Sequence, residues 1–357
     1  PKPSRHSASV AFRKTLQNIM DNNVLQTWAN HFSFPRAAIG SSKRGGKNRK
    51  SQATIINKRI EAFMTGDHPE PQTFKNKKPP SLKNLVSAKM AVGDIQGAVR
   101  IITSKETILP QSAETVEKLK EKHPQADPGS TTPPDCSEEN MCFKTNKENL
   151  LKAIRSFKNG ATGGPDGLLP QHLKDMTGDE LGETASKLLD TLVTFFNTII
   201  YPGKVPHEVI ETFYGANLIA LGKEDGGVRP IAVGFTLRRL AAKLIMSANN
   251  NFSKQEFQPN QLGVGTPKGA EAAVHALRSY LENPETKNKV LLKIDFKNAF
   301  NMIRRDKILN LVKNRLPQIY NFVYQEYAEK TSLRFGEEII ESSEGVQQGD
   351  PLGPFLF

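Results

Sequence analysis

An apolar run that ends in an acid constrains this chain more than any other feature. Residues 289–296 read KVLLKIDF, so that Asp295 follows a run of apolar side chains. A run that is apolar on both faces is typical of a central strand covered by helices. A carboxylate at the end of such a strand is partly desolvated, which costs free energy unless a partner neutralises it. We therefore expect a buried strand whose Asp295 caps the next helix, pairs with a neighbouring lysine, or binds a hard divalent cation.

The positive charge of the chain is concentrated near its start. The net charge is +12, and residues 1–80 hold 15 Lys and Arg against 4 Asp and Glu. Such a block is typical of a segment that contacts nucleic acid or directs nuclear import, although a solvated basic tail has the same composition. We expect residues 1–80 to form a basic, partly disordered arm. The cations of its densest part, SSKRGGKNRKSQ, are the candidate nucleic-acid contacts: Lys43, Arg44, Lys47, Arg49 and Lys50.

Composition excludes several classes of protein. The 357 residues are enough for two or three domains, and no apolar run is long enough to span a membrane. The first residues lack the apolar region of a signal peptide. Cys136 and Cys142 have no histidine close by and cannot complete a zinc site, so we assign them no role.

Apolar spacing divides the rest of the chain. Residues 81–125 have a helical pattern, 126–143 form a linker rich in Pro, Ser and acids, and 144–357 form the main α+β unit. Within that unit we expect one hairpin around Glu224–Gly227, a second that turns at Gly336, and helices between them. The helix after Thr266-Pro267 is expected to turn one stripe inward, made of Ala270, Ala273, Val274, Leu277 and Leu281.

Three further features suggest a nucleotide site. Lys223 and Arg229 flank the first hairpin turn, where a point charge and a fork of donors would suit a triphosphate; an ordinary charged surface is the alternative. Phe300, five residues after the acid, could wall a sugar or simply pack in the core. In GVQQGDPLGPFLF, the glycines allow close backbone approach and the glutamines offer uncharged hydrogen bonds, unless the loop only starts a helix.

The order of these motifs resembles the reverse transcriptase domain of non-LTR, LINE-type retrotransposons. The segments that carry the resemblance are GATGGPDGLLPQHLK, LIALGKEDGGVRPIAVG, QLGVGTPKGAEAAVHAL, KIDFKNAFNMI and GVQQGDPLGPFLF. The resemblance extends over about 210 residues from Lys144 and implies polymerase fingers and a partial palm in a right-hand-like fold. The segment between 88 and 124 is also similar to the region upstream of the polymerase in some such elements.

The resemblance assigns roles to individual residues. Asp295 would be the catalytic, metal-binding aspartate, and the Phe296 carbonyl oxygen a second metal contact. Phe300 would be the steric gate that rejects ribonucleotides, while Gln348 and Gly349 would line the nucleotide site. Lys223 and Arg229 would contact the incoming dNTP. The family copies an RNA template onto a DNA primer or target with two Mg²⁺ ions, and its site of action implies the nucleus; protein partners stay unknown.

Departures from the family pattern limit the expectation. Asn301 stands where many relatives have aspartate, and Gln347 where many have proline. The paired-aspartate motif expected after the last segment is not present before Phe357, and Asp350, in a loop expected to face the template, is no obvious substitute. We therefore expect this fragment to be inactive alone, because two metal ions need more than Asp295.

Two other functions are compatible with the sequence. The first is a non-catalytic nucleic-acid-binding relic of such an element. The second is an RNA-dependent RNA polymerase, which Phe300 at the gate position disfavours.

Overall fold

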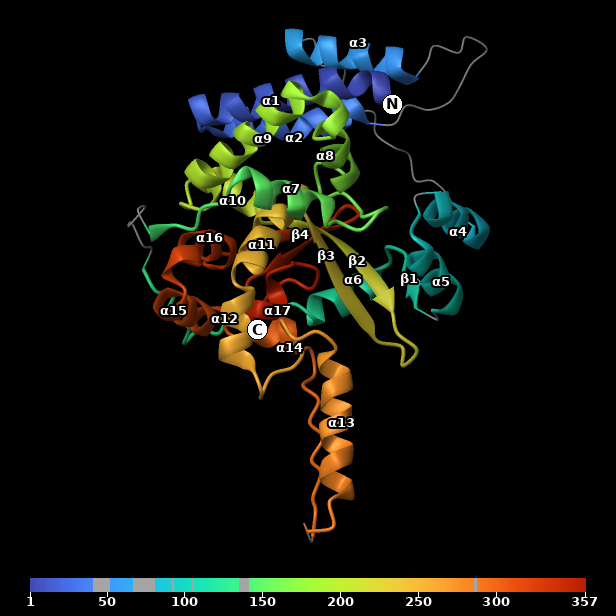
Figure 1. Cartoon of the computed structure of the whole chain (residues 1–357), viewed down its shortest axis with the longest axis vertical. Coiled ribbons are helices and arrows are strands. Elements are labelled where there is room, and N and C mark those ends of the chain that lie inside the picture. Colours follow the sequence, from blue (N-terminus) through green and yellow to red (C-terminus); the bar gives the residue numbers. More distant parts are fainter. Residues whose placement is uncertain (41–51, 67–80, 92, 105, 135–140, 286–287) are drawn as a thin grey trace.

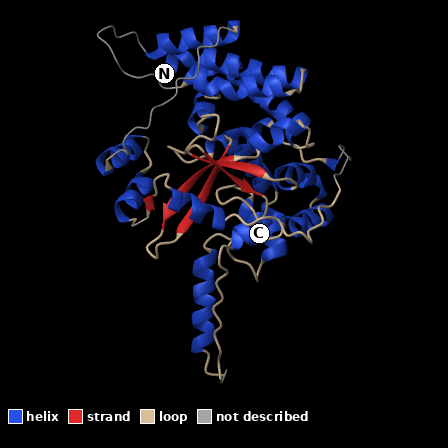
Figure 2. Cartoon of the chain, turned by 180° about the vertical axis from the view of Figure 1, so that it is seen from behind, coloured by secondary structure: helices blue, strands red, loops and turns tan. Residues whose placement is uncertain are grey.

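The structure is a computed structural model that describes residues 1–40, 52–66, 81–91, 93–104, 106–134, 141–285 and 288–357. A mixed five-stranded sheet lies at the centre, and helices surround it (Figures 1 and 2). The predicted α+β class is confirmed, whereas the right-hand arrangement of fingers and palm stays a prediction. None of the described helices is long and apolar enough to cross a bilayer.

The sheet is built from the two predicted hairpins, both of which are formed. The first pairs β2 (Ala216–Gly222) with β3 (Val228–Gly234), and the second pairs β4 (Thr331–Phe335) with β5 (Glu338–Ser342). The second turn contains Gly336 at a φ of 63°, a conformation that favours glycine. β2 also pairs in parallel with β4, and antiparallel with the short β1 (Thr107–Ile108).

One face of the sheet packs on α6 (Ala113–Glu121). Alternate residues of β2 and β3 point to this face, as the two-residue period of a strand requires, and they meet Leu119. The buried cluster consists of Leu119, Ala216, Leu218, Ala220, Val228, Ala232, Leu333, Phe335 and Ile340.

The first 66 residues differ from the expected arm. α1 (Arg5–Asp21), α2 (Leu25–Phe34) and α3 (Gln52–Thr65) share a hydrophobic core with the main unit, and α1 lies along α9 (Figure 1). Trp28 is wholly buried, and its ring lies 5.7 Å from that of Phe195 and 5.2 Å from that of Phe213. The expectation of a separate arm is wrong for these helices, because aromatic burial outweighs the local excess of charge. The basic block at 43–50 lies outside the described residues.

The segment expected as upstream helices is joined to the sheet. α4 (Leu82–Ala91), α5 (Ile95–Thr103) and α6 confirm the helical pattern, and β1 adds an edge strand that the pattern did not predict. The described parts of the linker pack on α16: Phe143 donates a 2.6 Å backbone hydrogen bond to Gln318, and the Tyr320 hydroxyl donates one of 3.0 Å to the Pro134 carbonyl. Cys136 lies outside the described residues, and the Cys142 sulfur accepts a 3.5 Å hydrogen bond from the Asn321 side chain.

Most of the remaining helices bury one apolar face. On α9, Leu188, Leu192 and Phe195, which are spaced three and four apart, are all buried. The helical elements of the main unit are α7 (Lys147–Arg155), α8 (Pro170–Met176), α9 (Glu183–Phe195), α10 (His207–Phe213), α11 (Thr236–Ala248), α12 (Asn250–Phe257), α13 (Gly269–Glu282), α14 (Ala299–Met302), α15 (Arg305–Arg315), α16 (Pro317–Tyr327) and α17 (Gly353–Leu356). Short turns of other helix types are η1 (Lys2–Ser4), η2 (Pro35–Ile39), η4 (Asp179–Leu181) and η5 (Phe196–Ile200).

Two expectations fail around the acid. Residues 289–296 run alongside α13 without forming a strand, and both project from the body (Figures 1 and 2). Val290 is 81% exposed and Leu292 77% exposed, and the expected inward stripe of α13 is largely exposed. The physical reason is that no described strand pairs with 289–296 and no described element covers either segment. An apolar pattern predicts which face can be buried, not whether a partner is in place.

Candidate active site

The loop before α17 brings distant parts of the predicted site together. The Val346 N–H donates to the carbonyl oxygen of Phe300 at 2.8 Å, and the Ala232 N–H donates to that of Gln348 at 2.6 Å. The loop therefore connects the segment after Asp295 with strand β3. Phe300 is thus bonded to the loop that contains Gln348 and Gly349, and the roles of these three residues stay predictions.

Two glycines permit these contacts. Gly345 has a φ of 68° and Gly349 a φ of 121°, a region that side chains rarely adopt. A Cβ atom at Gly345 would clash with the backbone of Asn301, and one at Gly349 would clash with the carbonyl oxygen of Ala232. The two glycines thus let the loop backbone approach other parts of the protein closely. The loop is held at Gly345 by the segment of Asn301 and at Gly349 by strand β3.

Gln348 has an unsatisfied side-chain acceptor. Its Oε1 atom is buried and has no hydrogen-bond partner among the described residues. Because leaving a buried amide oxygen unpaired costs about 1–3 kcal/mol, a ligand that donates a hydrogen bond would be favoured there. This is the feature of the loop that most directly indicates a binding site.

The hairpin holds its two cations differently. Arg229 lies opposite Leu221 in the register, and its Nη1 atom forms a 2.6 Å ion pair with Glu106, just before β1. The Lys223 side chain is exposed beside the turn. The backbone N–H of Lys223 donates to the Gly227 carbonyl at 2.8 Å. Because exposed ion pairs contribute little, about 0–1 kcal/mol, a triphosphate could displace Glu106 from Arg229.

Phe300 lies in a half-buried position. Its ring stacks on that of Phe357, with centroids 4.9 Å apart and an angle of 18° between the planes. The stacking keeps one face of the ring covered. The role of Phe300 as a steric gate stays a prediction.

Asp295 is not assembled into a metal site. Its side chain is exposed, as is that of Phe296, and no group of three acidic, His or Cys side chains that could hold a metal occurs among the described residues. The neighbouring backbone is anchored: Asn298 and Asn301 each donate a side-chain hydrogen bond to the Lys122 carbonyl, at 2.9 and 2.8 Å. The side-chain amide of Asn301 thus makes a structural hydrogen bond at this position.

Sequence reasoning missed buried charges beneath the loop. Arg238 and Glu326 form an ion pair at 2.5 Å, with side-chain exposures of 2% and 0%. Burial raises the pKa of Glu326 to about 8, with Arg238 opposing the shift and Asp350 adding to it. A signal was present: Arg238 shares a helical stripe with Ala241 and Ile245, so an arginine in an apolar face could have been recognised.

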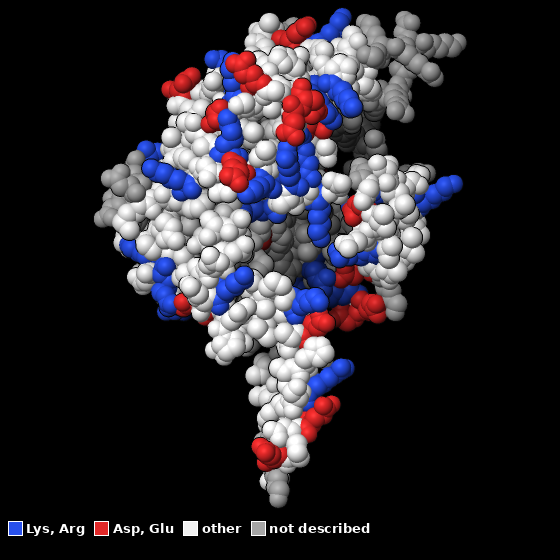
Figure 3. Space-filling model, viewed as in Figure 1, with Lys and Arg blue, Asp and Glu red and all other residues white. Residues whose placement is uncertain are grey.

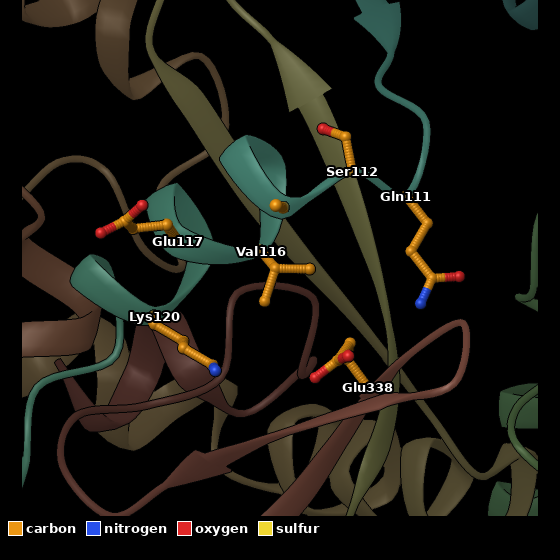
Figure 4. A pocket seen from close by; sticks show the side chains of 7 residues that line it. Gln111, Ser112, Val116, Glu117, Lys120 and Glu338 are labelled. Atoms are coloured by element: carbon orange, nitrogen blue, oxygen red, sulfur yellow. The ribbon is translucent and has the colours of Figure 1, made fainter.

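A surface hollow of about 570 Å³ lies elsewhere, beside α6 and β5 (Figure 4). The side chains of Glu117, Lys120 and Glu338 border it, and none of the predicted site residues does. It is therefore distinct from the candidate active site.

Comparison with known proteins defines the class. Residues 221–357 match the family described as reverse transcriptase (RNA-dependent DNA polymerase). This part of the chain, which contains the turn and second strand of the first hairpin, Asp295 and the loop, is similar to reverse transcriptases, and the resemblance seen in the sequence is confirmed for it.

A particular relative points to a mobile element. The chain is 28% identical over 220 residues to the retrotransposable element SLACS 132 kDa protein of Trypanosoma brucei gambiense. The match covers 59% of this chain and 17% of the relative's length. The family to which the domain belongs generally uses divalent metal ions.

Proposed function

We propose that this chain is the fingers and first palm part of an RNA-directed DNA polymerase from a non-LTR retrotransposon. The observation that carries the proposal is the loop whose backbone bonds to both Phe300 and Ala232. It joins the segment that contains Phe300 to strand β3 of the cationic hairpin and carries a buried amide acceptor, groups that suit a deoxynucleoside triphosphate. The family match and the SLACS relative support the same function.

In the proposed site each group has a separate task. Lys223 and Arg229 hold the triphosphate of the dNTP, with Arg229 exchanging Glu106 for phosphate oxygens. Gln348 supplies an acceptor, and Phe300 lies against the sugar and excludes a 2′-hydroxyl. Figure 3 shows Lys and Arg side chains around a hollow between the body and the lobe that contains α4 and α5, where a nucleic-acid backbone would be attracted.

The metal ions are the incomplete part of the site. Mg²⁺ takes six oxygen ligands, several of them from water and substrate phosphates, so Asp295 and the Phe296 carbonyl could supply two. Two ions need further carboxylates, and no group of three acidic, His or Cys side chains that could hold a metal occurs among the described residues. We therefore expect residues 1–357 alone not to polymerise.

The partners and location follow from the same proposal. An RNA template and a DNA primer or target would occupy the cationic face, and the element would act in the nucleus. Lys43, Arg44, Lys47, Arg49 and Lys50 would contact phosphates, so the affinity for nucleic acid should fall steeply with salt. Replacing these five by Gln should reduce the slope of log K against log salt; an unchanged slope would remove the block from the interface.

Primer extension on an RNA template tests the function. The full-length protein with Mg²⁺ and dNTPs is expected to extend a DNA primer, and Asp295→Asn should lower the rate by at least about a thousandfold, as loss of a group central to catalysis does. Asp21→Asn, at an exposed acid at the end of α1, is the matched control and should leave the rate unchanged. Nucleic-acid binding without any extension would favour the non-catalytic relic.

A further inference from the structure

Two buried arginines lie beneath the loop that presents Gln348. Arg238 comes from α11 and Arg305 from the first turn of α15, and they are 1% and 6% exposed. Burying a guanidinium is costly unless its donors are satisfied. The partners of the two arginines therefore show what the protein gains from them.

Arg238 links three elements to the loop. Its Nε donates to Glu326 of α16 at 2.5 Å, and its Nη1 donates to the Tyr214 carbonyl, just before β2, at 2.6 Å. The same Nη1 donates to the side-chain oxygen of Gln347 at 2.9 Å. The Gln347 amide in turn donates to Tyr214 at 3.0 Å and to the Thr331 hydroxyl at 3.1 Å. The residue next to Gln348 is thus held from both ends of its side chain.

Arg305 is hydrogen-bonded to the start of the same loop. Its Nε donates to the Gly345 carbonyl at 2.9 Å, and its Nη1 donates to the Ser342 and Glu329 carbonyls, each at 3.0 Å. Its guanidinium also lies 5.2 Å from the centre of the Tyr327 ring. The strand end and the loop start are therefore fixed together.

The end of the loop is held by an acid. The Tyr327 hydroxyl donates to Asp350 Oδ2 at 2.7 Å, and the Leu352 N–H donates to Asp350 Oδ1 at 3.0 Å. The same Oδ2 lies 3.8 Å from Nη2 of Arg238. Asp350 is thus a buried group whose two carboxylate oxygens are both engaged within the protein.

The hydrogen bonds of Arg238, Arg305 and Asp350 all hold the backbone or side chains of residues 345–350. An apolar cluster of the same volume would stabilise a fold at least as well as buried ions do, so stability alone does not account for the network. Directional hydrogen bonds fix orientation, and the carbonyl of Gln348 bonds to β3 only if the loop keeps this path.

We propose that Arg238 and Arg305 are positioning residues that set the Gln347–Gly349 loop for its contact with the incoming dNTP. The inference rests on the proposed polymerase function. The arginines themselves touch no substrate; they act through Gln347 and Gly345. Their removal should weaken nucleotide binding by misplacing Gln348, while primer and template binding stays as it was.

Steady-state kinetics of the full-length protein tests this inference. Gln347→Leu removes the link to Arg238 but leaves the Arg238–Glu326 pair in place, so folding should be preserved. We expect the KM for dNTP to rise about tenfold, the effect of losing one hydrogen bond to a charged group, with kcat changed less and the Kd for primer–template unchanged. Arg305→Lys, which keeps the charge but not the fork, should act in the same direction.

A matched surface variant separates the outcomes. Arg334→Lys changes an exposed arginine on β4 and should leave the KM unaltered. A lower melting temperature with an unchanged KM in both Gln347→Leu and Arg305→Lys would overturn the positioning role and leave a purely structural network. If the unmodified protein incorporated no dNTP, the proposed function would fail instead, and primer–template binding would show that the protein was folded.

Discussion

The backbone N–H of Ala232 on β3 donates a 2.6 Å hydrogen bond to the carbonyl oxygen of Gln348, which joins the first hairpin to the loop before α17. The two residues are far apart in the sequence, and the sheet alone does not connect them. This bond fixes the backbone that carries the glutamine acceptor against a strand of the cationic hairpin. Changes that break it should therefore affect both the stability and the site.

Gly349→Ala tests that connection. The new Cβ would clash with the Ala232 carbonyl at a backbone angle that alanine avoids, so we expect the free energy of unfolding to fall by about 2–4 kcal/mol. Gly226→Ala, in the first hairpin turn, is the control: its φ is 78° but no atom lies within 4 Å of the new Cβ. It should cost only about 1 kcal/mol in denaturant titrations. Equal losses would show that the close contact has no energetic weight.

Trp28→Ala tests whether the first helices belong to the body. The buried indole contacts rings of α9 and α10, and truncating such a side chain costs about 3–5 kcal/mol. Leu25→Ala, on the exposed side of α2, should change stability by less than about 0.5 kcal/mol. Chemical denaturation followed by circular dichroism measures both. A small loss for Trp28→Ala would restore the view of residues 1–80 as an independent arm.

Burial of His31 predicts loss of stability in acid. Burial lowers the pKa of His31 to about 3, from an ordinary value of 6.5, and its ring nitrogen lies 2.8 Å from the Thr15 hydroxyl. The unfolded chain binds this proton more readily, so the folded state loses stability as the pH falls from about 6.5 towards 3. His31→Phe should flatten this part of the pH–stability curve, whereas replacing the exposed His207 by Asn should not. An unchanged curve in His31→Phe would contradict the prediction.

Glu326 predicts a loss of stability as the pH rises. Burial raises its pKa from 4.5 to about 8, so the folded state keeps a proton that the unfolded chain has lost, and stability falls as the pH rises from about 4.5 to about 8. Arg238, Asp350, Tyr327 and Tyr214 face it, and Arg305 lies close by. Glu326→Gln mimics the neutral acid and should reduce the decline between pH 6 and 8, where the buried Asp166, with a pKa of about 6, no longer contributes. An unchanged decline between pH 6 and 8 would show that Glu326 is already ionised in the folded protein at pH 6, as a fully charged pair with Arg238 requires.

The exposed run around Asp295 predicts self-association. Val290, Leu292 and Ile294 present apolar surface to solvent, and contiguous patches of this kind favour contact between molecules. Val290→Ser with Leu292→Ser should shift the chain towards monomer in light scattering. Leu25→Ser with Leu311→Ser, two exposed leucines elsewhere, should have little effect. Monodisperse behaviour of the unmodified chain would contradict the prediction.

Local sequence patterns predicted many of the helices and hairpins of this fold but fewer of the contacts between them. The hairpins follow from turn residues such as Gly336, and the buried stripe of α9 follows from helical spacing. The failures share a cause: the exposed run at 289–296 and the outer face of α13 have the right pattern but no described partner. Arg238 lies in an apolar helical face, which marks it as buried, but no local pattern indicates that Glu326, distant in sequence, is its partner.

The choice between deoxyribonucleotides and ribonucleotides distinguishes a DNA polymerase from an RNA-copying enzyme. The full-length protein, given an RNA template and either dATP or ATP, should incorporate dATP with the higher kcat/KM. Phe300→Val should reduce this preference by raising the kcat/KM for ATP, since the ring would no longer exclude the 2′-hydroxyl. Equal use of both nucleotides by the unmodified protein would contradict a DNA polymerase and favour an RNA-copying enzyme.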